Sequence, residues 1–188
     1  ELRIPAFKNL AVNYFNSAPD SCRYYSYKLI KEAKSVKDHL HTALGYHYIA
    51  LTWYNSDNLP KTIENYHYAL DQYSILKDST HVSMVYSGIG NVYEKLDDNY
   101  KALDYYSLAK NLIRVSDRRD LSYLYENMAV SLKKTEQFEK AKLYYQRSLK
   151  IKIERKDTSG YGITYNNLGA LYETMNNKNK ALEYYQKS

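Results

Sequence analysis

Three groups of residues have types and spacings that could support chemistry. His39 and His41 are the closest pair among the five histidines and could hold a metal ion, but residues two apart on a helix point about 200° apart, so joint chelation is not expected. Cys22 falls at a helix start with no histidine near it in sequence, which favours a structural thiol over a nucleophile. Gly88-Ile89-Gly90 lies in the middle of a predicted helix, so it marks close packing and not a phosphate loop. The sequence predicts no catalytic residue, no metal site and no cofactor.

The composition favours a single all-helical domain. The 188 residues include only six Gly and three Pro, with 44% hydrophobic and 26% charged residues. Tyrosine supplies most of the aromatic side chains, with 24 residues against three Phe and one Trp. Because a tyrosine ring can pack while its hydroxyl reaches water or a backbone carbonyl, this composition suits a thin, two-layered helical body.

The charge distribution argues against direct binding of nucleic acid. The net charge is +6, but 27 basic residues are interspersed with 21 acidic ones. The densest basic pair, Lys133-Lys134, lies beside Glu136 and Glu139, which is typical of a solvated face. No apolar run is long enough for a membrane span or a signal peptide, and the single Cys22 excludes an internal disulfide while leaving the compartment open, cytoplasmic or periplasmic.

An internal repeat organises the whole chain. A small residue, which we call the marker, recurs at spacings of 39, 40, 39 and 40 residues, at Ala11, Ala50, Gly90, Ala129 and Gly169. Sixteen residues after each marker stands a tyrosine: Tyr27, Tyr66, Tyr106, Tyr145 and Tyr185. Twelve residues after it stand Ala102, Ala141 and Ala181, but Arg23 and Thr62 in the first two repeats, so the N-terminal helix pairs are expected to pack less closely.

These residues resemble the tetratricopeptide repeat over essentially the whole chain. The fifth repeat shows the family pattern most completely, with Tyr165, Leu168-Gly169, Tyr172, Ala181 and Tyr185. The family's ordinary period is about 34 residues, so the longer period here indicates longer helices. The resemblance implies an all-α, right-handed superhelix of five helix pairs, the last one truncated. The repeats span about 4–42, 43–82, 83–121, 122–161 and 162–188, forming one array over 1–188.

Turn chemistry divides each repeat into two helices. Pro19-Asp20 and Asp57-Asn58 favour turns between the helices of a pair. An Asp after each complete second helix can cap the next helix, at Asp38, Asp78, Asp117 and Asp157. The predicted helices are 4–16, 21–36, 40–55, 59–77, 80–96, 100–115, 121–134, 138–155, 161–175 and one from 179 onward.

Binding has a better case than catalysis, because the first helices of stacked pairs line one surface. Positions six and three before the marker, and one and four after it, face this groove; the first of them holds Leu44, Met84, Tyr123 and Ile163. Asn amides two residues before the marker add donors and acceptors for a ligand backbone. The candidate peptide-binding residues are His47, Tyr54, Ser87, Asn91, Glu94, Tyr123, Glu126, Asn127, Lys133, Asn166 and Asn167.

Two alternatives stay open for these residues. Some of the Asn side chains could instead cap or bridge helices within the array. The Lys and Asn arrangement that clamps a carboxylate in chaperone-binding family members is absent, since Lys8 is followed by Val12, so binding of a chaperone tail is disfavoured.

The sequence therefore favours a non-catalytic protein- or peptide-binding module. Its long repeats, rich in Tyr, Asn and Lys, resemble the sensory arrays of bacterial histidine kinases and transcription regulators. The second hypothesis is a structural scaffold that self-associates through the array ends, and a third places an active site in a further domain. Because the chain begins without Met and stops within a helix at Ser188, we expect it to be part of a longer protein.

Overall fold

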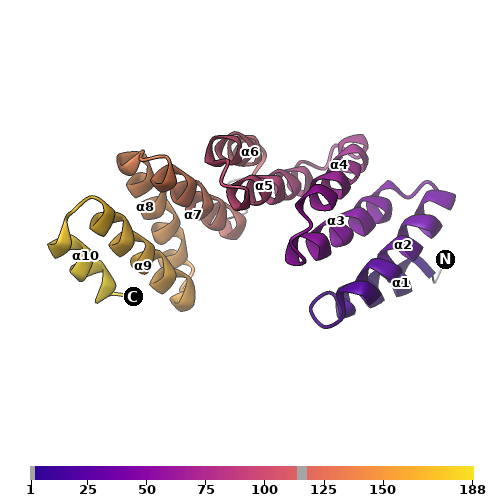
Figure 1. The fold of residues 1–188 in the computed structure, drawn as a ribbon. Coiled ribbons are helices and arrows are strands. Elements are labelled where there is room, and N and C mark those ends of the chain that lie inside the picture. Colours follow the sequence, from indigo (N-terminus) through magenta and orange to yellow (C-terminus); the bar gives the residue numbers. More distant parts are fainter. Residues whose placement is uncertain (1–2, 114–117) are drawn as a thin grey trace. The chain divides into compact units, whose positions relative to one another are not determined.

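A computed structural model describes residues 3–113 and 118–188, and these residues form α-helices and turns without any strand (Figure 1). The helices follow one another in adjacent pairs, as the all-α repeat fold requires. Their bounds are α1 Arg3–Tyr14, α2 Pro19–Ser35, α3 His39–Asn55, α4 Leu59–Ile75, α5 Ser79–Lys95, α6 Asn99–Leu112, α7 Arg118–Lys134, α8 Phe138–Glu154, α9 Thr158–Thr174 and α10 Lys178–Tyr185.

The chain divides into two compact units. The first spans Glu1–Val92 and the second Tyr93–Ser188, with the boundary inside α5. In the first unit α1 packs on α2, α2 on α3, and α3 on α4. In the second, α6 packs on α7, α7 on α8, α8 on α9, and α9 on α10. That all five repeats form one array stays a prediction.

The 40-residue period follows from the lengths of the elements. Seven of the helices, α2 to α5 and α7 to α9, contain 17 residues each. Turns of three residues join α2 to α3, α3 to α4, α4 to α5, α5 to α6, α7 to α8, α8 to α9 and α9 to α10. Two such helices with their two turns occupy 40 residues. The extra length therefore lies in the helices, as the long period predicts.

All seven three-residue turns have the same backbone conformation. The middle residue of each is left-handed, with φ between 54° and 60°, at Lys37, Asp57, Lys77, Asp97, Glu136, Lys156 and Asn176. After α2, the N–H of Lys37 donates to the carbonyl of Lys34 at 3.2 Å, and the N–H of Asp38 donates to that of Ala33 at 2.8 Å. These two bonds define a Schellman motif, and equivalent bonds occur in the other six turns.

The last residue of most of these turns also caps the next helix. Asp38, Asp78 and Asp157 accept hydrogen bonds from the N–H of the residue three positions on, which confirms the predicted role of these aspartates. Asn58, Asp98 and Asn177 cap the second helices in the same way. Asp117, together with the predicted end of the sixth helix at Val115, lies outside the residues that the structure describes.

The marker positions lie in the core, and the tyrosines sixteen residues later pack there in most repeats. Ala11, Ala50 and Ala129 have no exposed surface, and Gly90 and Gly169 are buried. Gly169 lies so close to the Tyr185 ring that a Cβ atom would come within 2.6 Å of it. Tyr66, Tyr106 and Tyr145 are buried, as the repeat pattern predicts.

The first repeat departs from the predicted register by one residue. Tyr27 is 54% exposed, whereas Ser26 and Cys22 have no exposed surface. The second helix starts eight residues after the marker in the first repeat, at Pro19, but nine residues after it in the second, at Leu59. Cys22 therefore occupies the place of Thr62 and Ala102. The assignment of Arg23 to this buried position was therefore wrong, and burial of the small Cys22 and Thr62 removes the reason to expect looser packing there.

A second aromatic contact recurs within the helix pairs. Tyr93 stacks on Tyr105 with ring centroids 5.4 Å apart, and Tyr172 stacks on Tyr184 at 5.3 Å. The ammonium groups of Lys101 and Lys180 lie 5.3 Å and 5.2 Å from the first ring of each pair. In both pairs the tyrosine rings pack against each other, and a lysine ammonium lies on the face of one ring. No helix among the described residues is both long and apolar enough to cross a membrane.

Candidate peptide-binding surface

The predicted binding residues all lie on the first helices of pairs, but they belong to two units that we describe separately. In the first unit are His47 and Tyr54 on α3 and Ser87 and Asn91 on α5. In the second unit are the remaining candidates, carried by the end of α5, by α7 and by α9: Glu94, Tyr123, Glu126, Asn127, Lys133, Asn166 and Asn167.

His47 lies inside the first unit and not on its surface. Its ring meets those of Tyr66 and Tyr73 edge to face, with centroids 5.7 Å and 6.5 Å away. Nδ1 is buried and has no hydrogen-bond partner among the described residues. Burial lowers the pKa of His47 to about 4, and the charge of His81 adds to this effect. The neutral ring is therefore part of the core, while Tyr54, Ser87 and Asn91 are half-buried.

Glu126 is buried in the second unit, where it belongs to a polar network that joins three helices. Its carboxylate accepts a hydrogen bond from the ammonium of Lys152 on α8, which is only 1% exposed. The Lys152 ammonium also donates to Thr164 Oγ1 on α9 at 3.0 Å. Asn167 Nδ2 donates to Glu126 Oε1 at 3.0 Å, and Thr164 Oγ1 lies 3.1 Å from the same oxygen. We call these four residues the buried network.

The buried network shows that part of the predicted surface has an internal role. Asn167 bridges α9 to α7, which is the alternative that the sequence left open for some of the asparagines. Neither Glu126 nor Lys152 is available as an isolated surface charge, because each neutralises the other. Lys133, the other charged candidate on α7, is half-buried and does not pair with Glu126, whose partner is Lys152.

Sequence reasoning missed Lys152 and Thr164, although the repeat register contained a signal. His47 and Glu126 both stand three residues before their markers, and Tyr73 and Lys152 both stand 23 residues after them. In the second repeat the residues at these two positions are His47 and Tyr73, whose rings meet edge to face. In the fourth repeat they are Glu126 and Lys152, which form an ion pair. A comparison of these positions would have indicated that the lysine is buried with an acidic partner.

Glu94 is also engaged within the second unit. Its Oε2 accepts a hydrogen bond from the Tyr106 hydroxyl at 3.2 Å, and its Oε1 lies 3.5 Å from the ammonium of Lys134. Tyr185 donates to Glu173 at 2.8 Å at the same positions of the fifth repeat. The same hydrogen bond, from the tyrosine sixteen residues after the marker to the glutamate four residues after it, therefore recurs in the third and fifth repeats.

Exposed apolar side chains remain on the first helices. Tyr123 is 43% exposed and Ile163 is 57% exposed in the second unit, and Met84 is 44% exposed in the first. All three stand six residues before a marker. Tyr123 covers the buried network, since the Lys152 ammonium lies 5.3 Å from its ring centroid. Asn166, one helical turn after Ile163, is exposed as well.

The chemistry that this surface offers is recognition. Tyr123 and Ile163 provide apolar contacts and Asn166 an amide that can donate and accept, while the buried network beneath fixes their positions. Within the described ranges, no three His, Cys, Asp or Glu side chains gather where they could bind a metal ion.

Solved structures of repeat proteins share this fold at low sequence identity. BtubC (BKLC) from P. vanneervenii is 20% identical, with a TM-score of 0.76 over 92% of this chain and 72% of that chain. The apo form of RapI is 13% identical, with a TM-score of 0.81 over 99% and 81%. A putative kinesin light chain with nearly identical TPR-like repeats, from Podosopora anserina, is 12% identical, with a TM-score of 0.77 over 98% and 92%. No curated protein matches the chain in sequence.

A family model adds sequence support to the fold. The tetratricopeptide repeat model matches residues 81–154 and 120–188, which together make up more than half of the chain. Repeats of this family are generally non-catalytic modules for protein–protein interaction. The helix pairs, the matched residues and the structural neighbours agree: the chain belongs to the tetratricopeptide repeat family.

Proposed function

We propose that this chain is a non-catalytic module that binds a peptide segment of a partner protein along its first helices. The observation that supports this most directly is the exposure of Tyr123 and Ile163 at the same position of successive first helices in one unit. Large apolar side chains that repeat on a surface in this way mark interaction sites.

The exposed groups define the kind of ligand. Tyr123 and Ile163 suit apolar side chains of an extended or helical peptide, and Asn166 suits its backbone. Asn127 and Lys133 flank this surface on α7, with Tyr54, Ser87 and Asn91 at related positions of the first unit. The proposal therefore centres on exposed and half-buried candidates and gives the buried Glu126 and His47 only a supporting role.

The finer assignment is the sensory or regulatory part of a larger bacterial signalling protein. The support for it is the resemblance of these long, Tyr-, Asn- and Lys-rich repeats to sensory arrays. A partner peptide bound on the first helices would then be the signal that the module detects.

Peptide selection tests the binding surface. Peptides selected from a random library on the wild-type chain should bind Tyr123→Ala and Asn166→Ala more weakly, by about 1 to 3 kcal/mol, or about 5- to 150-fold in Kd. Lys150→Ala, an exposed change on the second helix α8, should bind like the wild type. Thermal melting of all variants checks that the fold is kept.

Two outcomes would count against the proposal. Selected peptides that bind all variants equally would place the contact elsewhere, and a selection that yields no specific peptide would favour the scaffold hypothesis. Light scattering of the wild type over a range of concentrations would then test self-association.

A further inference from the structure

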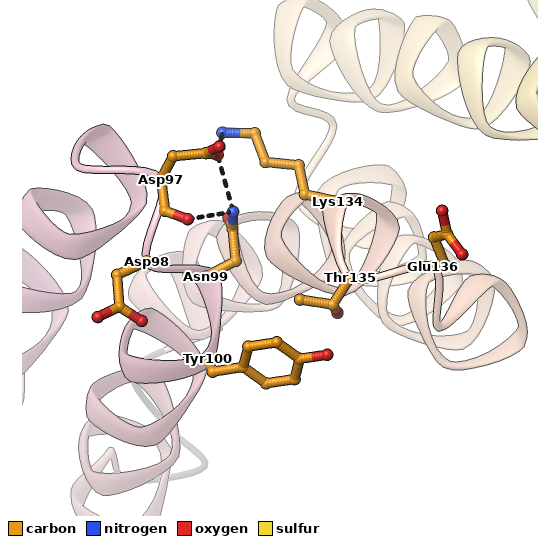
Figure 2. A pocket seen from close by; sticks show the side chains of 7 residues that line it. All are labelled: Asp97, Asp98, Asn99, Tyr100, Lys134, Thr135 and Glu136. Atoms are coloured by element: carbon orange, nitrogen blue, oxygen red, sulfur yellow. Dashed lines mark hydrogen bonds and ion pairs between the residues drawn. The ribbon is translucent and has the colours of Figure 1, made fainter.

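A pocket of about 540 Å³ lies at the turn edge of the second unit, away from the first-helix surface (Figure 2). It is lined by residues 97–100, from the turn after α5 and the start of α6, and by residues 134–136, from the end of α7 and the turn that follows it. We call it the turn pocket. It is independent of the proposed peptide surface, which uses the exposed sides of α7 and α9.

Two carboxylates stand on opposite sides of the turn pocket. Asp97 and Glu136 are the left-handed residues of consecutive turns, with φ of 60° and 59°, so the repeat itself brings them to equivalent places. Figure 2 shows their side chains at the two sides of the pocket, with Lys134 above. Asp97 lies 3.8 Å from the Lys134 ammonium, which is closer to Glu94. Glu136 makes no ion pair with any residue that the structure describes.

Asn99 supplies an independent indication that a donor belongs here. This residue is only 6% exposed, and its Nδ2 donates to the carbonyl oxygen of Asp97 at 3.1 Å and to Asp97 Oδ1 at 2.9 Å. Its own Oδ1 is buried and accepts no hydrogen bond from the described residues. Buried polar atoms are rarely left in this state. An acceptor without a donor, next to Glu136, which is unpaired among the described residues, and to Asp97, which shares the Lys134 ammonium with Glu94, points to a hydrogen-bonding cation.

Tyr100 adds a surface on which such a cation could lie. Its ring is 68% exposed and extends along the pocket below Thr135 (Figure 2). A cation on the face of a tyrosine ring is attracted by its quadrupole, as the stacked Lys101 and Lys180 illustrate elsewhere in this unit.

The equivalent pocket one repeat later lacks these features. It is lined by residues 136–140 and Met175, with Phe138 in the place of Asn99 and Glu139 in the place of Tyr100. The combination of two facing carboxylates, an unsatisfied amide oxygen and an exposed ring is therefore absent from the next repeat, so the repeat by itself does not produce it.

We propose that the turn pocket binds the guanidinium group of an arginine side chain from a partner protein. A guanidinium is planar and carries five N–H donors, so it can lie on Tyr100 while it donates to Asp97 and Glu136. Its remaining donors match the acceptor of Asn99. A lysine ammonium satisfies the charge but neither the planar stacking nor the separated acceptors.

The test is a titration of the isotope-labelled chain with Nα-acetyl-arginine amide, observed by amide NMR. Saturable shifts are expected at Asn99, Tyr100 and Thr135. The matched probes are Nα-acetyl-citrulline amide, which is neutral and nearly isosteric, and Nα-acetyl-lysine amide. Citrulline should give no saturable shift, and lysine should bind at least about threefold more weakly than arginine.

Variants separate the site from general charge attraction. The double variant Asp97→Asn/Glu136→Gln should lose the saturable shifts, and Tyr100→Leu should weaken them several-fold. The control Asp104→Asn/Asp120→Asn removes the same charge from exposed positions outside the pocket and should bind like the wild type. Equal shifts with citrulline, no saturation with arginine, or wild-type binding by the double variant would each overturn the proposal.

Discussion

The ammonium of Lys152 on α8 and the carboxylate of Glu126 on α7 form a buried ion pair, and Thr164 of α9 lies within hydrogen-bond distance of both. The pair links the two helices of the fourth repeat, and Thr164 and Asn167 extend the link to the fifth. Both charges are removed from water in the folded protein. If one side chain is replaced, the other charge stays buried without a partner.

Lys152→Met should therefore destabilise the second unit strongly, by about 3 to 5 kcal/mol. The double change Glu126→Leu/Lys152→Met should recover most of this loss, because no isolated charge remains. Urea unfolding, combined with amide hydrogen exchange in α7 to α9, measures both effects. Lys150→Met on the exposed side of α8 is the control and should change stability little. A loss below about 1 kcal/mol in the single variant would show that the pair is solvated.

His47 should make the first unit less stable as the pH falls. Its folded-state pKa of about 4 lies below the unfolded value of about 6.5, so the unfolded chain binds the proton more tightly. The free energy of unfolding has its full value above about pH 6.5 and declines as the pH falls towards about 4, with a loss of about 2 kcal/mol at pH 5. Urea midpoints measured from pH 7.5 to 5 should show this slope. In His47→Leu the slope should be smaller by that amount, and an unchanged slope would contradict the burial.

Tyr106 allows its packing and its hydrogen bond to be measured separately. The side chain has no exposed surface, so Tyr106→Ala should cost about 3 to 5 kcal/mol. Tyr106→Phe keeps the ring and removes the hydroxyl that donates to Glu94, so it should cost about 1 kcal/mol. Tyr100→Phe, on an exposed ring, serves as the control for hydroxyl removal. Chemical unfolding that shows little loss for Tyr106→Ala would mean that the repeat register is wrong.

A lysine-to-glycine substitution should stabilise the protein at a left-handed turn residue and destabilise it inside a helix. Lys77→Gly, at φ of 54°, should stabilise the first unit by about 0.5 to 1 kcal/mol, because a Cβ atom disfavours this conformation. Lys31→Gly, on the exposed side of α2, should destabilise it by about 1 kcal/mol. Thermal melts compare the two variants directly, and effects of equal sign would contradict the role of the turn.

Much of the fold could be predicted from the sequence, because the regular spacing of the repeated residues indicates where each helix pair lies. The markers and their tyrosines place the helix pairs, and Asp38, Asp78 and Asp157 mark helix starts as capping chemistry requires. The shift at Tyr27 was not predicted, since the sequence does not show that α2 begins one residue sooner after its marker than the later second helices do. The burial of Cys22, Ser26, Leu29 and Ala33 shows which side of α2 faces the core.

The candidate site was predicted less completely, because position on a helix does not decide which neighbour a polar side chain meets. Glu126 was correctly placed on a first helix, but its partner Lys152 lies 26 residues away and is of a type that is almost always exposed. The turn pocket was not predicted either. It depends on two turns that are separated in sequence and come together only when consecutive pairs stack.

The seven Schellman turns have a further consequence for how such a chain can change its length. The last residue of such a turn serves both helices. The N–H of Asp38 donates to the carbonyl of Ala33 at the end of α2, and its side chain caps the start of α3. An inserted residue would turn the following helix by about 100° and remove its apolar side from the core. Three-residue connections of this kind are therefore expected to keep their length, and the array is expected to lengthen by duplication of whole 40-residue units.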